Sequence, residues 1–177
     1  DLTRGLGCGG FPERGAEAAK ESLNEIKAVL KNTDMVFVCA GMGGGTGTGG
    51  APVVAQVAKD TGAIVIGTVT MPFKIEKARV EKAEFGLEQL REVSDTVIVI
   101  DNNRLVSIAG NLPIQQAFAV ANELISTMIR GIVETIAVPS LVNLDYADVK
   151  AIMTNGGVAA IGVGASDTTN RVDEAVK

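Results

Sequence analysis

The sequence predicts an α/β fold in which a parallel sheet is flanked by helices. Short, continuous apolar runs of the kind that form buried parallel strands recur along the chain. Between these runs lie segments whose apolar residues repeat at helical spacing. Strands that alternate with helices through short connections form parallel sheets, because each helix carries the chain back across the sheet.

The individual elements follow from their apolar patterns and their end signals. Pro52 suits the first turn of one helix and Gly62 its end, because a first turn needs no proline N–H and glycine readily terminates helices. A helix of about 22 residues within 112–138 would be roughly 33 Å long, enough to connect two domains. In chain order we expect a helix at 13–30, a strand at 35–40, a helix at 51–60, a strand at 63–70, a helix at 77–93, a strand at 96–100, helices at 112–138 and 145–153, and a strand of a second domain at 159–165.

Composition excludes several classes of function. The net charge of −5 is scattered along 177 residues, so we expect no basic surface for nucleic acid. Histidine is absent, which excludes a Ser-His-Asp triad and histidine metal sites, and we assign no metal-ligating side chains. Cys8 and Cys39 form neither a CxxC motif nor a disulfide framework, which fits a reducing cytosol. No apolar run approaches the ~20 residues of a membrane span, so we expect no direct membrane insertion.

Both ends of the sequence are typical of an internal piece of a longer protein. The chain begins at Asp1, just before the glycine-rich stretch TRGLGCGGFP. It ends inside NRVDEAVK, which has a helical pattern without a stop signal. We therefore interpret the sequence as part of a larger chain.

The glycine-rich residues 43–50, called the cradle below, lie between a predicted strand and a predicted helix. This is the carboxyl edge of a parallel sheet, where ligands bind in such folds. Glycines let backbone N–H groups turn toward an anion, and a helix N-terminus adds roughly half a positive charge. Thr46 and Thr48 would add hydroxyl donors. A tight turn alone would need only one or two glycines, so we predict that the cradle binds phosphate.

The motif narrows the phosphate ligand only in part. No lysine lies in the cradle, which excludes a Walker-type P-loop. GTGTGG (45–50) matches GxGxxG, but a dinucleotide site would also need an acid about 20 residues later to bind ribose. Residues 61–75 contain no acid. A nicotinamide-dependent oxidoreductase therefore stays only as an alternative.

Five motifs in order carry a resemblance to a known family. GGGTGTG after a buried strand resembles the signature loop of the tubulin superfamily. VTMPF, NNRL, AFAVANE and NLDYADV resemble the later nucleotide and synergy loops of the FtsZ family of cell-division GTPases. The resemblance implies a Rossmann-type sheet of the tubulin/FtsZ kind, a long central helix and the start of a second, α+β domain. It assigns residues 1–138 to a GTP-binding domain that lacks its N-terminal part, with the central helix from about 112, and residues 139–177 to the synergy loop and a truncated C-terminal domain.

The resemblance also implies which residues bind the phosphates of GTP. The turn similar to residues 6–10 closes on the γ-phosphate in that family, so Cys8, Gly9 and Gly10 would supply backbone donors. A plain loop before a helix is the alternative for this turn. The cradle residues assigned to GTP are Gly43, Gly44, Gly45, Thr46 and Gly47.

A second pair of residues is assigned to the ribose or the phosphates. The family's Glu and Arg after the PF dipeptide correspond to Glu76 and Arg79. The spacing here is one residue shorter than the family's usual Glu-Gly-Lys-x-Arg. The alternative is an acid in a first helical turn with a partner at i+3.

The resemblance places the guanine base against Asn102, Phe118 and Asn122. Phe118 and Asn122 are four residues apart, so they share a helix face on which a ring can stack on the base while an amide reads its edge. An amide offers both a donor and an acceptor, which the guanine edge can use. The alternative makes Phe118 a core residue and Asn122 a solvated one. Asp101 replaces the proline that usually precedes Asn102 in the family.

The catalytic residues implied by the resemblance are Asp145 and Asp148 of NLDYADV. The residues by themselves also fit a capping box, with Asp145 as N-cap and Asp148 as a first-turn acid. In the family the two aspartates project into the neighbouring subunit's nucleotide site and polarise the attacking water. Phosphoryl transfer needs mainly positioning and charge stabilisation, so such a pair can act without histidine. A site completed by head-to-tail contact would also propagate a filament.

The resemblance thus implies a cytoskeletal GTPase of cell division and septation. It would bind GTP or GDP with Mg²⁺, polymerise into the division ring, and hydrolyse GTP at the subunit interface. Its implied partners are further copies of itself and membrane-tethering adaptors, and its implied location is the cytoplasm at the division site. A nucleotide-binding filament protein with little turnover is the non-enzymatic alternative.

Overall fold

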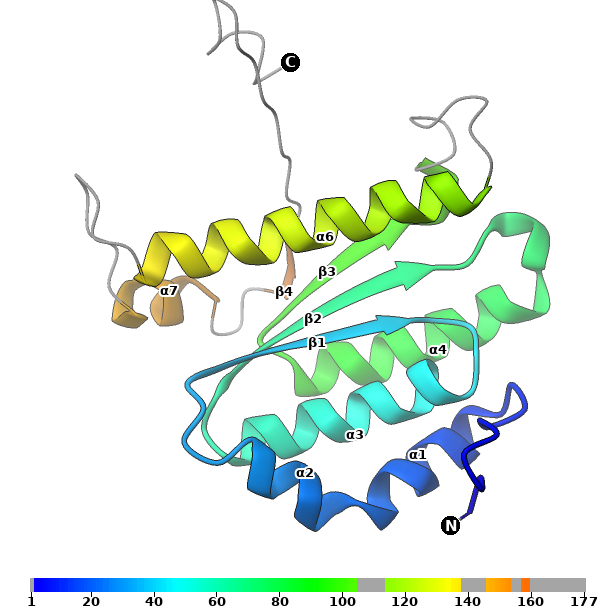
Figure 1. Cartoon of the computed structure of the whole chain (residues 1–177), viewed down its shortest axis with the longest axis horizontal. Helices are drawn as coiled ribbons and strands as arrows, with labels where there is room; N and C mark the ends of the chain where they lie inside the picture. The colour runs from blue at the N-terminus through cyan, green and yellow to red at the C-terminus, as the bar shows by residue number, and fades with distance from the viewer. Residues whose placement is uncertain (1, 105–113, 138–145, 154–156, 160–177) are drawn as a thin grey trace, which may run out of the picture.

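A computed structural model describes residues 2–104, 114–137, 146–153 and 157–159. Its centre is a parallel sheet of four strands in the order β1-β2-β3-β4 (Figure 1). The strands are β1 (Met35–Gly41), β2 (Ile64–Met71), β3 (Thr96–Asp101) and β4 (Gly157–Ala159). The predicted α/β class with a parallel sheet is therefore confirmed.

Helices cover both faces of this sheet (Figure 1). Helix α6, the long central helix, packs on one face, with the short helix α7 beside its C-terminal end. The other face carries α3 and α4, and α1 packs on the outside of α3. The helices are α1 (Pro12–Glu21), α2 (Leu23–Val29), α3 (Thr46–Asp60), the 3-10 turn η1 (Lys74–Glu76), α4 (Ala78–Val93), α6 (Ile114–Ala137) and α7 (Tyr146–Met153).

Alternate side chains of β2 form two hydrophobic cores. Val65 and Val69 pack with Leu90 in the core under α3 and α4. Ile64 and Ile66 face the opposite way and join the core under α6. All five are almost fully buried. A strand covered on both faces must be apolar at every position, which explains the continuous apolar runs.

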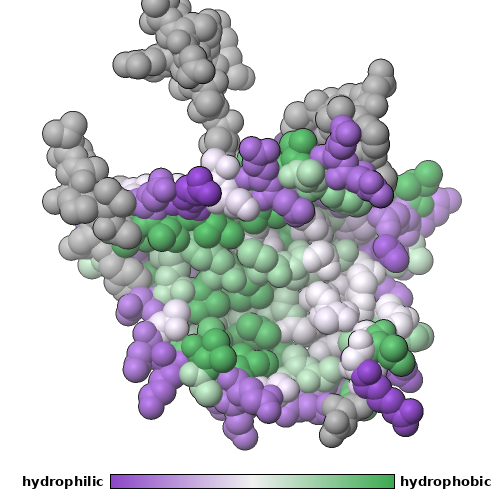
Figure 2. Space-filling model, viewed as in Figure 1, coloured by the Kyte–Doolittle hydropathy of each residue, from purple (hydrophilic) through white to green (hydrophobic). Residues whose placement is uncertain are grey.

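Strand β1 forms one edge of the sheet within the part of the chain that the structure describes. Its residues Met35, Val36 and Phe37 are only half-buried. Figure 2 shows apolar residues gathered on the side of the molecule that faces the viewer, between the polar rims of α6 and of the outer helices. Among the described helices, none has the length and apolar character needed to cross a lipid bilayer.

Three predicted elements differ from the observed ones. Helix α3 begins at Thr46 and carries Pro52 in its interior, so residues 46–50 of the cradle are helical rather than loop. The predicted helix 13–30 breaks at Ser22 into α1 and α2. The strand expected at 159–165 overlaps β4 only at Ala159, and residues 160–165 lie outside the described residues; β4 pairs in parallel with β3, Val97 opposite Val158. A strand that returns after a helix on the same sheet adds to it in parallel, which accounts for this placement.

Because the strands are parallel, the sheet has two different ends. All carboxyl ends of the strands lie at one, called the carboxyl edge, and all amino ends lie at the other. The cradle, the loop before η1 and the turn at Asn102 all follow carboxyl ends of strands and lie at one edge. Helix α7 lies at the other edge, where Thr96 at the start of β3 donates its hydroxyl to the Met153 carbonyl over 3.1 Å. Figure 1 shows α7 near the amino ends of the strands. The six residues of β3 span about 20 Å, so the two edges are at least that far apart.

Candidate functional site

The N-terminus of α3 forms the floor of the candidate site. Its first helical hydrogen bond runs from the Gly49 N–H to the Gly45 carbonyl over 3.0 Å. The N–H groups of Thr46, Gly47 and Thr48 precede this bond, and such groups have no acceptor within their own helix. They lie where the helix dipole is positive, an arrangement that suits a phosphate group.

The glycines of the cradle also allow helices α1 and α3 to approach closely. A Cβ placed on Gly45 would lie 2.7 Å from the Cβ of Cys8 and 2.9 Å from the Phe11 nitrogen. A Cβ on Gly49 would collide with the Pro12 carbonyl oxygen. Glycine is needed at these positions because two backbone segments are in contact there. This requirement is separate from phosphate binding and was not predicted.

The two threonines of the cradle have different surroundings. Thr48 is 1% exposed, and its Oγ1 accepts a hydrogen bond from the Gly43 N–H over 2.9 Å. The expectation that Thr48 adds a donor for phosphate is therefore wrong, because its side chain points into the protein, where it also meets Gly86 of α4. Thr46 is exposed, and its hydroxyl donates to the Cys8 sulfur over 3.5 Å.

A tight turn of residues 8–11, called the 8–11 turn, lies directly beside the cradle. The Phe11 N–H donates to the Cys8 carbonyl over 3.1 Å. Gly9 and Gly10 both have positive φ, 60° and 77°, as the central residues of a type I′ turn do. Lys82 of α4 donates to the Gly10 carbonyl over 2.7 Å. The structure thus brings Cys8, Gly9 and Gly10, which we expect to contact the γ-phosphate, next to the helix start that we expect to bind the phosphates.

The segment between β2 and α4 forms a wall of the site. Arg79 donates to the Glu76 carboxylate over 2.9 Å, and the other oxygen of Glu76 accepts the Phe73 N–H at 3.0 Å. This is the local i, i+3 pair that we gave as the alternative, and a contact of either residue with GTP stays a prediction. Arg79 is 66% exposed, so its guanidinium faces solvent. A Cβ on Gly43 would lie 2.9 Å from the Arg79 carbonyl, so this wall touches the cradle.

The loop after β3 contains a buried amide. Asn102 is 7% exposed, and none of the described residues forms a hydrogen bond with its Oδ1. The neighbouring turn is fixed by Asp101, whose Oδ1 accepts the backbone and side-chain N–H groups of Asn103 at 2.8 and 2.7 Å. Asp101 therefore shapes this loop with its carboxylate. A buried acceptor without a protein donor is suited to a ligand that brings one.

Phe118 and Asn122 lie one turn apart on α6 and both are exposed. The Phe118 side chain is 43% exposed, and its ring centroid lies 6.0 Å from that of Phe73, which follows β2. The alternative that places Phe118 in the core does not describe this arrangement. Asn103 accepts the Lys74 N–H over 3.1 Å, so the loops after β2 and β3 meet beside the two rings.

Of the two predicted catalytic residues, the structure describes only Asp148. Asp145 lies outside the described residues. Asp148 is exposed in the first turn of α7, at the opposite edge of the sheet. The carboxylate of Asp148 therefore cannot act on a ligand bound in the cradle of its own chain.

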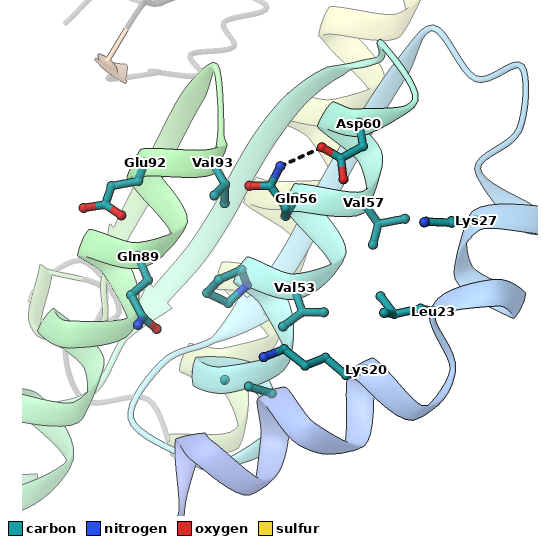
Figure 3. A pocket seen from close by; sticks show the side chains of 13 residues that line it. Lys20, Leu23, Lys27, Val53, Gln56, Val57, Asp60, Gln89, Glu92 and Val93 are labelled. Carbon is teal, nitrogen blue, oxygen red and sulfur yellow. Dashed lines mark hydrogen bonds between the residues drawn. The ribbon is translucent and has the colours of Figure 1, made fainter.

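A separate groove of about 480 Å³ lies on the outer side of α3, between α1, α2 and α4 (Figure 3). Lys20 and Lys27 lie on one side of it, and Glu92 lies on the other. Gly49 of the cradle lines this groove, but none of the residues assigned individually to GTP does. The candidate site is therefore the carboxyl edge of the sheet and not the groove.

Lys82 and Phe73 are site residues that the sequence reasoning missed. Lys82 follows Arg79 by three residues on α4, so helical spacing could have placed it on the same side. Phe73 lies in the PF dipeptide that was used only to locate Glu76. Neither contact could be derived from spacing alone, because each joins elements far apart in the sequence.

Comparisons with known proteins agree with this geometry. A family model described as the GTPase domain of the Tubulin/FtsZ family matches residues 1–110. Cell division protein FtsZ 2 of Methanocaldococcus jannaschii is 61% identical over 172 residues, which is 97% of this chain and 45% of the relative. Cell division protein FtsZ 2 of Halobacterium salinarum is 55% identical over 176 residues, 99% of this chain and 45% of the relative. The chain thus spans about half the length of the curated relatives it matches.

A solved structure gives the same result for the fold. The structure titled as an empty FtsZ dimer of M. jannaschii superposes with a TM-score of 0.93 at 52% identity. The match covers 99% of this chain and 51% of the solved chain. The predicted tubulin/FtsZ-like fold is therefore confirmed.

Proposed function

The chain belongs to the Tubulin/FtsZ family, and from this premise we propose that it is part of a GTPase that polymerises head to tail in cell division. GTP and GDP are its nucleotides. The observation that carries the proposal is the placement of Asp148 and the cradle at opposite edges of one sheet. Because Asp148 lies at one end of the sheet and the cradle at the other, the two can meet only when two copies of the protein associate.

The nucleotide lies across the carboxyl edge of the sheet. Its phosphates accept hydrogen bonds from N–H groups at the start of α3, and its γ-phosphate meets the 8–11 turn. The base stacks at the exposed ring of Phe118, where Asn122 and the Asn102 oxygen, which has no partner among the described residues, meet its donors. Glu76 and Arg79 lie between these ends, beside the ribose or the phosphates.

Hydrolysis takes place where one subunit's α7 meets the next subunit's cradle. Asp145 and Asp148 of the first subunit orient a water molecule toward the γ-phosphorus of the second. The water oxygen forms a bond to phosphorus, the bond to the β,γ-bridging oxygen breaks, a water proton passes to a phosphate oxygen, and GDP and inorganic phosphate leave. The reaction asks mainly for positioning and charge stabilisation, which carboxylates and helix N–H groups provide.

The described residues contain no group of three or more histidine, cysteine or carboxylate side chains that could hold a metal ion. A Mg²⁺ ion therefore enters with the nucleotide, since Mg²⁺ binds substrate phosphates and water more readily than all-protein cages. The exposed Thr46 hydroxyl at the start of α3 would offer a side-chain oxygen to that ion's hydration shell. The ion would neutralise charge on the phosphates.

The partners of the whole protein follow from the same arrangement. Opposite, unlike ends make a heterologous contact, which continues into an open filament. The M. jannaschii relative titled as an FtsZ dimer supports self-association. We place the filament in the cytoplasm at the division site, held to the membrane by adaptor proteins.

The proposal is tested by measuring GTP hydrolysis by the full-length protein over a range of protein concentrations. A shared active site requires the rate per subunit to rise from near zero as subunits associate. A site contained in one subunit gives a constant rate per subunit. ATP in place of GTP is the control and should give little turnover. A filament that forms with GTP but hydrolyses none of it would favour the non-enzymatic alternative.

A further inference from the structure

We propose that Lys82 is the positioning residue that holds the 8–11 turn against the cradle and so sets the preference of the site for GTP over GDP. The inference rests on the proposed function and deepens it. Neither Lys82 nor any other residue of α4 beyond Arg79 was expected to act on the nucleotide.

The contact between Lys82 and the turn is short and charged. The Lys82 ammonium donates to the Gly10 carbonyl over 2.7 Å, and its nitrogen lies 5.5 Å from the centre of the Phe11 ring. Arg14 lies 5.6 Å from the same ring. A hydrogen bond from a charged donor is stronger than a neutral one, and a cation near an aromatic face gains further attraction. The Lys82 side chain is half-buried, so solvent screens these contacts only in part.

On the side of α4, the 8–11 turn is attached by Lys82. Its own hydrogen bond, from Phe11 to Cys8, closes the turn but does not attach it to α4. The turn contains two glycines with positive φ, Gly9 and Gly10. Glycine loses more conformational freedom than any other residue when it becomes ordered. Lys82 provides an attachment because α4 is a helix of 16 residues packed on the sheet.

The effect of Lys82 passes on to the cradle through the backbone. Gly45 lies so close to the turn that a Cβ on it would come within 3.0 Å of Cys8 and Phe11 atoms. The turn is thus held between the Lys82 ammonium on one side and the cradle on the other. If the ammonium is removed, the turn can move away from the cradle, whereas the start of α3 keeps its own hydrogen bonds.

This geometry predicts that the 8–11 turn affects the affinity for GTP but not the affinity for GDP. The N-terminus of α3 would bind phosphates of both GTP and GDP, but the 8–11 turn would meet only the γ-phosphate. Displacing the turn therefore weakens GTP binding and leaves GDP binding almost unchanged. A merely structural role of Lys82 would weaken both nucleotides equally.

The experiment compares variants of the full-length protein by equilibrium titration with GTPγS and with GDP. Lys82→Met keeps the aliphatic stem and removes the charge, and we expect its GTPγS affinity to fall about tenfold with GDP affinity within about twofold of wild type. Lys82→Arg restores a cation and should lie within about threefold of wild type for both nucleotides. Lys59→Met removes the same charge at the far end of α3 and should change neither affinity.

Thermal unfolding of each variant verifies that it folds. If Lys82→Met does not fold, Lys82→Leu, which also removes the donor and the charge, takes its place in the same titrations. An unchanged ratio of the two affinities, or an equal loss of both, overturns the role of Lys82 while leaving the proposed function intact. A wild-type protein that binds neither nucleotide overturns the proposed function itself.

Discussion

The backbone N–H of Gly43 donates a hydrogen bond to Oγ1 of the buried Thr48 over 2.9 Å. This bond ties the loop after β1 to the first turn of α3, so the loop and the helix start form one unit. The Gly43 N–H is consequently engaged within the protein, which leaves the N–H groups further along the cradle to meet an anion. The rigidity of the cradle therefore depends on a hydroxyl that does not itself face the ligand.

Thr48→Val, which keeps the shape of the side chain but removes the acceptor, should destabilise the cradle. The Gly43 N–H would lose its partner in a buried place, at a cost of about 1–3 kcal/mol in the free energy of unfolding. Thr48→Ser keeps Oγ1 and is the matched control, with a smaller loss from its missing methyl group. Urea unfolding of the nucleotide-free protein measures both. A valine variant as stable as the serine variant would contradict this role.

Gly44 and Gly45 should respond in opposite ways to an added side chain. A Cβ on Gly44 meets no protein atom within 4 Å, whereas one on Gly45 meets Cys8 and Phe11. Gly44→Ala should therefore change the free energy of unfolding by less than about 0.5 kcal/mol, and Gly45→Ser should lower it by about 1–3 kcal/mol. Both should weaken GTP binding in equilibrium titration, Gly44→Ala because the space it fills is where we place the phosphates. Full GTP affinity in Gly44→Ala would show that the phosphates do not lie there.

Asn122→Leu should reduce the preference for guanine over adenine. The exposed amide on α6 lies one turn beyond Phe118, so its loss would leave groups of the guanine edge without partners. The cost would be roughly 1–3 kcal/mol if the bound base excludes water there. Competition of ATP against labelled GTP measures the change. Competition identical to that of wild type would mean that another residue reads the base.

Asp148→Ala should bind GTP normally and lose most hydrolysis. The reason is its position on α7, at the edge of the sheet away from its own cradle. Gly45→Ser should also be inactive by itself, because its cradle is distorted. A mixture of the two variants should regain part of the activity, since an intact Asp148 can then face a loaded cradle on its neighbour. GTP hydrolysis of each variant and of the mixture is the measurement.

Two outcomes would contradict the shared site. The first is normal hydrolysis by Asp148→Ala, which is what a residue that only stabilises the start of α7 would give. The second is a mixture that stays inactive although sedimentation shows both variants in the same polymer. Either result would leave the fold and the nucleotide site as they stand and remove Asp148 from catalysis.

Much of the fold could be predicted because local chemistry decides it. The three main strands lie within about one residue of their predicted positions, since a strand buried on both faces must be continuously apolar, as Ile64, Val65 and Ile66 are. The position of the candidate site followed as well, because the glycine-rich loop comes after such a strand and all parallel strands end at one edge.

The start of α3 was mispredicted because distant backbone determines it. Sequence signals favoured a helix that begins near Pro52, yet the helix begins at Thr46. Gly45 and Gly49 have no room for a side chain, since α1 lies directly against them. A glycine that is needed for close packing and one that is needed for a flexible loop have the same letter in a sequence.

By itself the sequence determined the alternation of strands and helices, the phosphate-binding edge, and the five motifs that indicate the family. Only the tertiary structure decided that Thr48 points inward, that Lys82 holds the 8–11 turn, and that Asp148 lies at the far edge of the sheet. The physical reason is the separation along the chain of the residues that interact. Apolar periodicity and turn chemistry act between neighbours in the chain, whereas Lys82 and Gly10 are 72 residues apart and meet only because α1 and α4 both pack against α3.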